Sequence, residues 1–176
     1  SGLLSGPKNI EFIKEDGLWY ALLVNYGNSS LLRIKFDNGL ENPPSATSLG
    51  NLSGWNILRG LELVRVTGEL YAAVSSFNNN KTTILSFGTS ITNPPTVFND
   101  ITDELISGPI GIRLVNSNNK WFAFIASNNN NKILKVSFGT DLSNTPTITE
   151  LLSVPKPTEL KFWQAGLIHH LFTTSE

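Results

Sequence analysis

The stretch Ser137-Phe138-Gly139-Thr140, followed by Asn144-Thr145-Pro146, decides the fold because the chain contains it three times. The earlier copies are Lys35-Phe36-Asp37-Asn38-Gly39 with Asn42-Pro43-Pro44, and Ser86-Phe87-Gly88-Thr89 with Asn93-Pro94-Pro95. The three phenylalanines are 51 residues apart (87 − 36 and 138 − 87). Pro44, Pro95 and Pro146 keep the same spacing. The chain is therefore a repeat protein.

Each repeat predicts four short β-strands. In the first repeat, residues 9–14 alternate apolar and polar side chains, which is the period of a half-buried strand. Glu15-Asp16-Gly17 predicts a hairpin turn, and residues 18–24 are apolar on both faces, as in a strand covered on both sides. Residues 31–36 predict a third strand with one wet face, and residues 45–49 predict a weaker outer strand.

The later repeats keep this order. Their predicted second strands are 70–74 and 121–125, and asparagine-rich turns follow at 78–81 and 128–131. A fourth copy begins at Lys156-Pro157, 48 rather than 51 residues after Pro109. It contains a first strand with Leu160 and Phe162, a turn at 164–166 and a second strand at 168–173.

Four strands per repeat of about 50 residues predict an all-β fold, a β-propeller with about three and a half four-stranded blades. The expected blades cover residues 5–52, 53–105 and 106–152, and the half blade covers residues 153–176. A β-sandwich is the alternative, but it gives no reason for a constant period. Because propellers usually have four to eight blades, we expect another protein, a second copy or further sequence of the same polypeptide to complete the ring.

Composition excludes several classes of partner. The 176 residues include 13 basic and 14 acidic side chains and no cysteine. Nucleic acid and anionic membranes need a basic surface that this balance does not supply. No apolar run approaches the roughly 20 residues that span a bilayer, so we expect no membrane insertion. The chain begins at Ser1 within the repeat pattern, which we interpret as a processed or excerpted piece of a longer protein.

The repeat resembles a known family. Its pattern joins Gly-Pro and Ile-x-Phe to a Gly-x-Trp-Tyr-Ala strand, an Asn-rich turn and Phe-Gly-x-x-Leu-x-Asn-x-Pro, as at 6–25 and 108–146. This pattern resembles NHL-like propeller repeats of large secreted Bacteroidota surface proteins, the type IX secretion cargo associated with gliding motility. The second repeat departs with Leu58 in place of Pro, and the fourth has His169-His170 in place of Trp-Tyr. The resemblance implies a secreted protein at a bacterial cell surface.

No catalytic constellation is evident in the sequence. His169 and His170 are adjacent in a strand, so they point to opposite faces and cannot bind one ion together. Asp100, Asp103 and Glu104 could hold Ca²⁺, although they lack the spacing of an EF-hand loop. We therefore assign no catalytic, cofactor or metal residues, and Ca²⁺ stays a possible ligand.

The turns between second and third strands offer a possible binding rim. In a propeller these turns lie beside the crossovers between blades, where they would present Asn28, Asn79 and Asn130 with Ser5, Ser53 and Ser107. Amides and hydroxyls suit sugar hydroxyls or peptide backbone. The alternative is that asparagine satisfies turn geometry.

Three functions are consistent with these features. The first is a non-catalytic structural, adhesion or interaction module of an exported surface protein. The second is a carbohydrate-binding, lectin-like propeller, with glycans as partners. The third is an enzyme resembling the lactonases, which use acidic metal ligands at the propeller axis.

Overall fold

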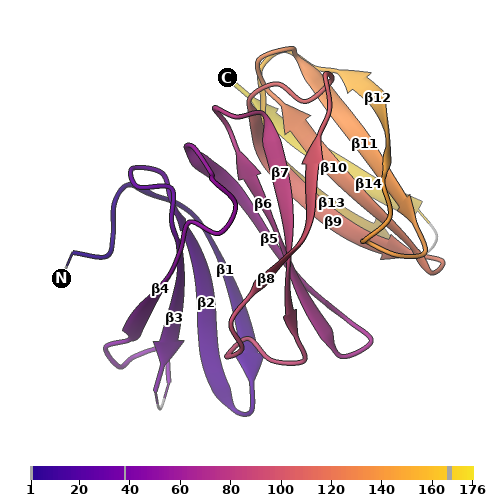
Figure 1. The fold of residues 1–176 in the computed structure, drawn as a ribbon. Helices are drawn as coiled ribbons and strands as arrows, with labels where there is room; N and C mark the ends of the chain where they lie inside the picture. The colour runs from indigo at the N-terminus through magenta and orange to yellow at the C-terminus, as the bar shows by residue number, and fades with distance from the viewer. Residues whose placement is uncertain (1, 38, 166–167) are drawn as a thin grey trace.

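The computed structural model describes residues 2–37, 39–165 and 168–176 (Figure 1). Every regular element among these residues is a β-strand. The fourteen strands are β1 (Pro7–Glu15), β2 (Leu18–Asn25), β3 (Leu31–Phe36), β4 (Ser45–Gly50), β5 (Leu58–Val66), β6 (Glu69–Ser76), β7 (Lys81–Gly88), β8 (Thr96–Thr102), β9 (Pro109–Ser117), β10 (Lys120–Ser127), β11 (Lys132–Gly139), β12 (Thr147–Ser153), β13 (Pro157–Ala165) and β14 (Ile168–Ser175). Within these residues no helix has the length and hydropathy that a membrane span requires.

The strands form four separate antiparallel sheets in chain order. Three sheets have four strands, β1–β4, β5–β8 and β9–β12, and the last has only β13 and β14. Successive sheets pack face to face and fan out from one side (Figure 1). The first strands β1, β5, β9 and β13 pack against one another, so they line the axis of the fan. The predicted all-β propeller segment of three and a half blades is confirmed.

The individual strands also match the predictions closely. β2 is buried along most of its length, as its two apolar faces require, whereas β4 is largely exposed at the outside of its blade. The predicted hairpin at Asp16-Gly17 has both residues at positive φ. The turn expected at 164–166 lies partly outside the described residues.

The core consists of apolar layers between neighbouring blades. Leu61, Leu70 and Phe87 belong to the layer between the first two blades. The next layer, between the second and third blades, contains Ile112, Trp121 and Phe138. The layer between the third blade and the half blade is much smaller, with Ala126, Ile133 and Leu160 as its buried members.

Two glycines let the first strands approach each other. A Cβ on Gly60 would collide with the carbonyl oxygen of Ile110, and one on Gly111 would collide with that of Thr158. The buried Ser75 hydroxyl also accepts a hydrogen bond from the Gly60 amide and donates one to the Ile110 carbonyl, both at 2.6 Å. Neighbouring first strands therefore approach each other closely through their backbones.

A second hydrogen bond, repeated between blades, lies at the same end of the sheets, beside the start of each first strand. The side-chain oxygens of Ser29, Asn80 and Asn131 accept from the backbone amides of Ile57, Gly108 and Lys156, at 2.8, 2.8 and 2.9 Å. The three acceptors are 51 residues apart, and the donors follow at 51 and then 48. The deletion of three residues thus falls between Gly108 and Lys156 and leaves this contact intact.

The donor residue of this contact has positive φ in every copy, and this makes Ile57 unfavourable. Gly108 has φ of 57° at the equivalent position, and Ile57 has φ of 62°. A β-branched side chain is strained there. We expect Ile57→Gly to be more stable than Ile57→Ala by about 1 kcal/mol, the reverse of the usual order within a strand. Thermal unfolding of the two variants checks this, and an alanine variant equal to or above the glycine variant would contradict it.

Candidate functional site

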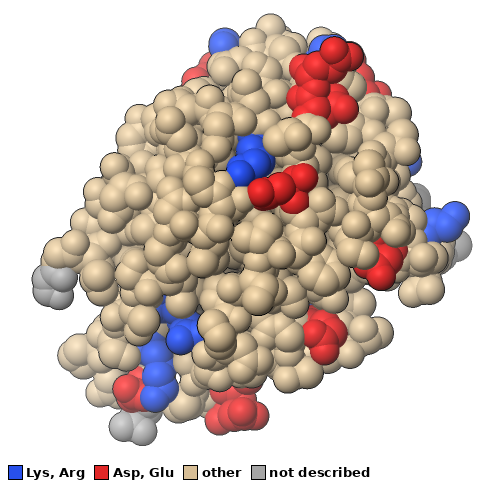
Figure 2. Space-filling view, viewed as in Figure 1, with Lys and Arg blue, Asp and Glu red and all other residues tan. Residues whose placement is uncertain are grey.

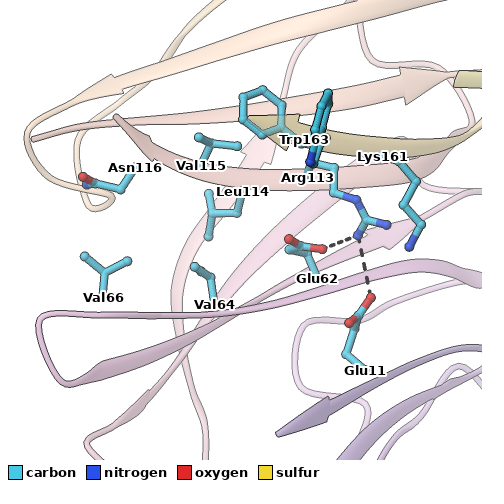
Figure 3. A pocket seen from close by; sticks show the side chains of 11 residues that line it. Glu11, Glu62, Val64, Val66, Arg113, Leu114, Val115, Asn116, Lys161 and Trp163 are labelled. Atoms are coloured by element: carbon cyan, nitrogen blue, oxygen red, sulfur yellow. Dashed lines mark hydrogen bonds and ion pairs between the residues drawn. The ribbon is translucent and has the colours of Figure 1, made fainter. Parts of the chain in front are cut away.

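A large cavity lies at the axis, between the first strands. It has a volume of about 550 Å³ and contains charged, apolar and aromatic side chains (Figure 3). All its lining residues come from β5, β9 and β13 except Glu11 of β1. The cavity therefore requires the blades to be assembled around the axis, since no single blade forms it.

Four charged residues lie at equivalent positions of the four first strands. Glu11, Glu62 and Arg113 are 51 residues apart, and Lys161 follows after 48. Each blade therefore contributes one charge to the cavity, two acidic and two basic. The propeller repeat places these residues together although they are far apart in the sequence.

Arg113 links the two carboxylates. Its Nη1 forms an ion pair and hydrogen bond with Glu62 Oε2 and lies 3.7 Å from Glu11 Oε1 (Figure 3). Burial raises the pKa of Glu62 to about 7, because it outweighs the opposing effect of Arg113. Burial also raises the pKa of Glu11, against Arg113 and Lys161. The pKa of Glu62 therefore lies near neutral pH.

An apolar wall completes the cavity. Val64 and Leu114 line one part of it, and Trp163 stands at its edge with 58% of its surface exposed (Figure 3). Fixed hydrogen-bonding groups beside an exposed indole are suited to a ligand that has both hydroxyl groups and an apolar face. Because two of the four charges are cations, the axis suits such a neutral ligand better than a divalent metal.

The three asparagines predicted to line a rim make hydrogen bonds within the protein. Asn79 Nδ2 donates to the Gly54 carbonyl at 3.0 Å, and Asn130 Nδ2 donates to the equivalent carbonyl of Leu105 at 2.7 Å. Asn28 Oδ1 accepts from the Ser30 hydroxyl at 2.7 Å. The bonds of Asn79 and Asn130 hold the crossovers between blades, whereas that of Asn28 is local to its turn. A ligand role for the three amides stays a prediction.

The predicted rim serines do not form one repeated set. Ser5 and Ser107 are 102 residues apart, or two periods, and their backbone amides donate to Asn25 Oδ1 and Ser127 Oγ at 3.2 and 2.8 Å. The equivalent residue in the second blade is Asn56 rather than Ser53. Ser53 instead accepts a hydrogen bond from Lys81 Nζ at 2.8 Å and donates one to Asp100 at 2.5 Å.

Two of the three acidic residues considered for Ca²⁺, Asp100 and Asp103, accept hydrogen bonds from nearby groups. Asp100 also accepts from Thr83 at 2.6 Å, and Asp103 accepts from the Leu105 amide at 2.9 Å. Glu104 lines a shallow hollow with Asp103. The described part of the chain contains no group of three His, Cys, Asp or Glu residues suited to a metal. A calcium site stays a prediction.

The histidine pair is described only in part. The His170 ring lies between Trp163 and Phe172, with centroid distances of 5.3 and 6.1 Å. The His169 side chain lies outside the described residues.

On the face shown in Figure 2, charged side chains are scattered between large uncharged areas, and no broad basic surface appears there.

The fold and the axial cavity define the class: a segment of a β-propeller with a polar pocket at its axis. Among solved structures it is similar to a GH43 β-1,3-galactosidase, with a TM-score of 0.60 and 14% identity over 94% of this chain and 39% of that one. It is also similar to a bifunctional GH43-CE protein of Bacteroides eggerthii, with a TM-score of 0.55 and 11% identity over 89% of this chain and 21% of that one. This chain thus spans less than half of either neighbour.

Sequence comparisons add no family. No protein-family model matches the chain, and no curated protein matches it. The GH43 neighbours are five-bladed propellers, which agrees with a partial propeller here. The resemblance to NHL-like repeats of exported surface proteins stays a prediction.

The raised pKa of Glu62 predicts a pH-dependent stability. A carboxyl that holds its proton more tightly when folded stabilises the fold fully below its unfolded pKa, and this contribution is lost as the pH rises through about 7. Between pH 5 and pH 8, we expect the free energy of unfolding of wild type to fall by on the order of 2 kcal/mol relative to that of Glu62→Gln. Denaturant unfolding at each pH measures the difference.

Glu150→Gln is the matched control for this experiment, because Glu150 lies on an outer strand and pairs with Lys132 at 2.9 Å. Its stability curve should run parallel to that of wild type. If the Glu62→Gln curve were also parallel, Glu62 would not have the raised pKa.

The rim hydrogen bonds predict a second effect on stability. Asn130→Ala removes the bond to the Leu105 carbonyl and should lower the free energy of unfolding by about 1 kcal/mol. The neighbouring Asn129 is exposed, and Asn129→Ala should change little. Chemical denaturation measures both. Equal stability of the two variants would remove the support for a structural role of the rim amides.

Proposed function

We propose that this chain is part of a β-propeller that binds carbohydrate at its axis without hydrolysing it. The observation that carries this proposal is the axial cavity, where Glu11, Glu62, Arg113 and Lys161 come from equivalent positions of four blades beside Trp163. Carboxylates and cations bind the hydroxyls of a sugar, and an indole packs on its apolar face.

The balance of charge favours a neutral sugar. Two acidic and two basic side chains line the cavity, and Arg113, which is 7% exposed, pairs with both carboxylates, so the site has no strong net charge to attract an ion. The cavity volume of about 550 Å³ is within the range of small-ligand sites. The likeness to two GH43 proteins is compatible with a sugar ligand, although at 11% and 14% identity it supports the fold alone.

A glycan array that includes β-1,3-linked galactose tests the proposal, followed by calorimetry with the tightest neutral oligosaccharide. We expect saturable binding that Trp163→Ala and Glu62→Gln each weaken at least about tenfold, equivalent to 1.4 kcal/mol. Leu152→Ala and Glu150→Gln, on the outer strand β12, are the matched controls and should bind as wild type does. Failure to bind any neutral glycan, or unchanged affinity in both axial variants, would refute an axial sugar site.

Hydrolysis is measured in the same preparation with chromogenic glycosides. The proposal expects no turnover above buffer. Turnover that is lost in Glu62→Gln would mean that the chain belongs to an enzyme rather than to a binding module.

A second candidate function is a structural or adhesion module, favoured by the exposed apolar residues on the outermost blade faces. Phe12 on the first blade and Trp163 and Phe172 on the half blade are between 49% and 58% exposed. Secretion and a place at a bacterial cell surface belong to this candidate as predictions. It expects attachment to other proteins that does not depend on Glu62.

A further inference from the structure

A second, apolar groove lies between the third blade and the half blade. It has a volume of about 170 Å³ and is adjacent to the axial cavity, with which it shares Val115 and Phe162. Its other lining residues are Ser117, Phe122, Phe124 and Lys135. Phe124 stacks on Phe162 at 5.8 Å, and Lys135 Nζ lies 5.1 Å from the centre of the Phe122 ring.

The same positions are covered where two complete blades meet. Val64, Val66 and Tyr71 are 51 residues before Val115, Ser117 and Phe122. All three pack against the layer that contains Trp121 and Phe138 of the third blade. Tyr71 contacts the edge of the Trp121 ring at 5.7 Å, and Phe138 is only 3% exposed.

Phe138 belongs to β11, the third strand of its blade, and Phe87 of β7 is buried in the same way between the first two blades. In these blades the third strand pairs with the second strand. β14 is the second strand of the half blade, and within the described residues it pairs only with β13. The groove is therefore the position that the third-strand phenylalanine fills elsewhere.

The repeat stays in register up to this edge. The Glu176 amide donates to the Lys156 carbonyl at 3.1 Å, as the Asn128 amide donates to the Gly108 carbonyl at 3.1 Å. Both residues of the later pair follow the earlier pair by 48. Glu176 thus occupies the position of Asn128, the first residue of the turn that leads into β11.

We propose that the groove between the third blade and the half blade is a docking site for a β-strand with the pattern Leu-x-Val-x-Phe-Gly. The strand pairs antiparallel with β14, and its phenylalanine enters the groove against Phe122. The pairing of Ala123 with Val136 in the third blade sets the register, because Leu171 is equivalent to Ala123 and faces the third blade. Backbone bonds to an exposed edge provide affinity, and the phenylalanine provides specificity.

A strand grafted onto the full chain tests the proposal. Residues 129–139 are copied directly after Glu176, which supplies the turn and a third strand at high effective concentration. We expect the graft to raise the melting temperature by about 4 °C or more and to protect the β14 amides from hydrogen exchange. The same graft with Phe138→Asp in the copied segment is the matched control and should give less than half of the rise.

Two results would overturn the proposal. One is a graft that changes neither the melting temperature nor β14 exchange, or that performs equally with Phe138→Asp. The other is a dimer of the natural chain, detected by light scattering, that dissociates when the graft is added to the chain. This result would assign the groove to a second copy. The graft leaves the axial residues unchanged, so its failure does not bear on the sugar site.

Discussion

The contact between neighbouring first strands is the constraint on which the rest of the structure depends. Gly60 and Gly111 have no side chain where the next blade's backbone passes, and Ser75 bridges the Gly60 amide to the Ile110 carbonyl. Glu62 and Arg113 follow these glycines by two residues, so the close approach also brings their side chains together. The close packing of the first strands and the formation of the cavity therefore depend on the same contact.

Polar residues at the rim and charged residues at the axis have different roles. At the rim, short amides and hydroxyls hold the crossovers and repeat with the period, as Asn79 and Asn130 do. At the axis, the equivalent position changes from Glu to Arg to Lys around the ring. A position that keeps its place but varies in charge is suited to recognition, whereas one that keeps its hydrogen bond is suited to support.

The architecture could be predicted from the sequence because the period is written directly in it. The constant spacing of Phe36, Phe87 and Phe138 predicted the blade length, and alternation within each repeat located the strands to within a few residues. The axial site was missed because its members differ chemically: Glu11, Glu62, Arg113 and Lys161 match in position but not in residue type. Aligning the repeats and reading each column for charge would have found it, whereas the partners of Asn130 and the raised pKa of Glu62 depend on packing.

The central claim, that the ligand binds at the axis, is tested most directly by the four tryptophan indole signals in a proton–nitrogen NMR titration. Trp163 lines the axial cavity, whereas Trp19, Trp55 and Trp121 lie within the blades or between them. With the neutral oligosaccharide selected by the array, the account predicts a saturable shift of the Trp163 signal and little change in the other three. A saturating ligand that leaves Trp163 unmoved, or that shifts only the rim asparagine amides, would contradict it.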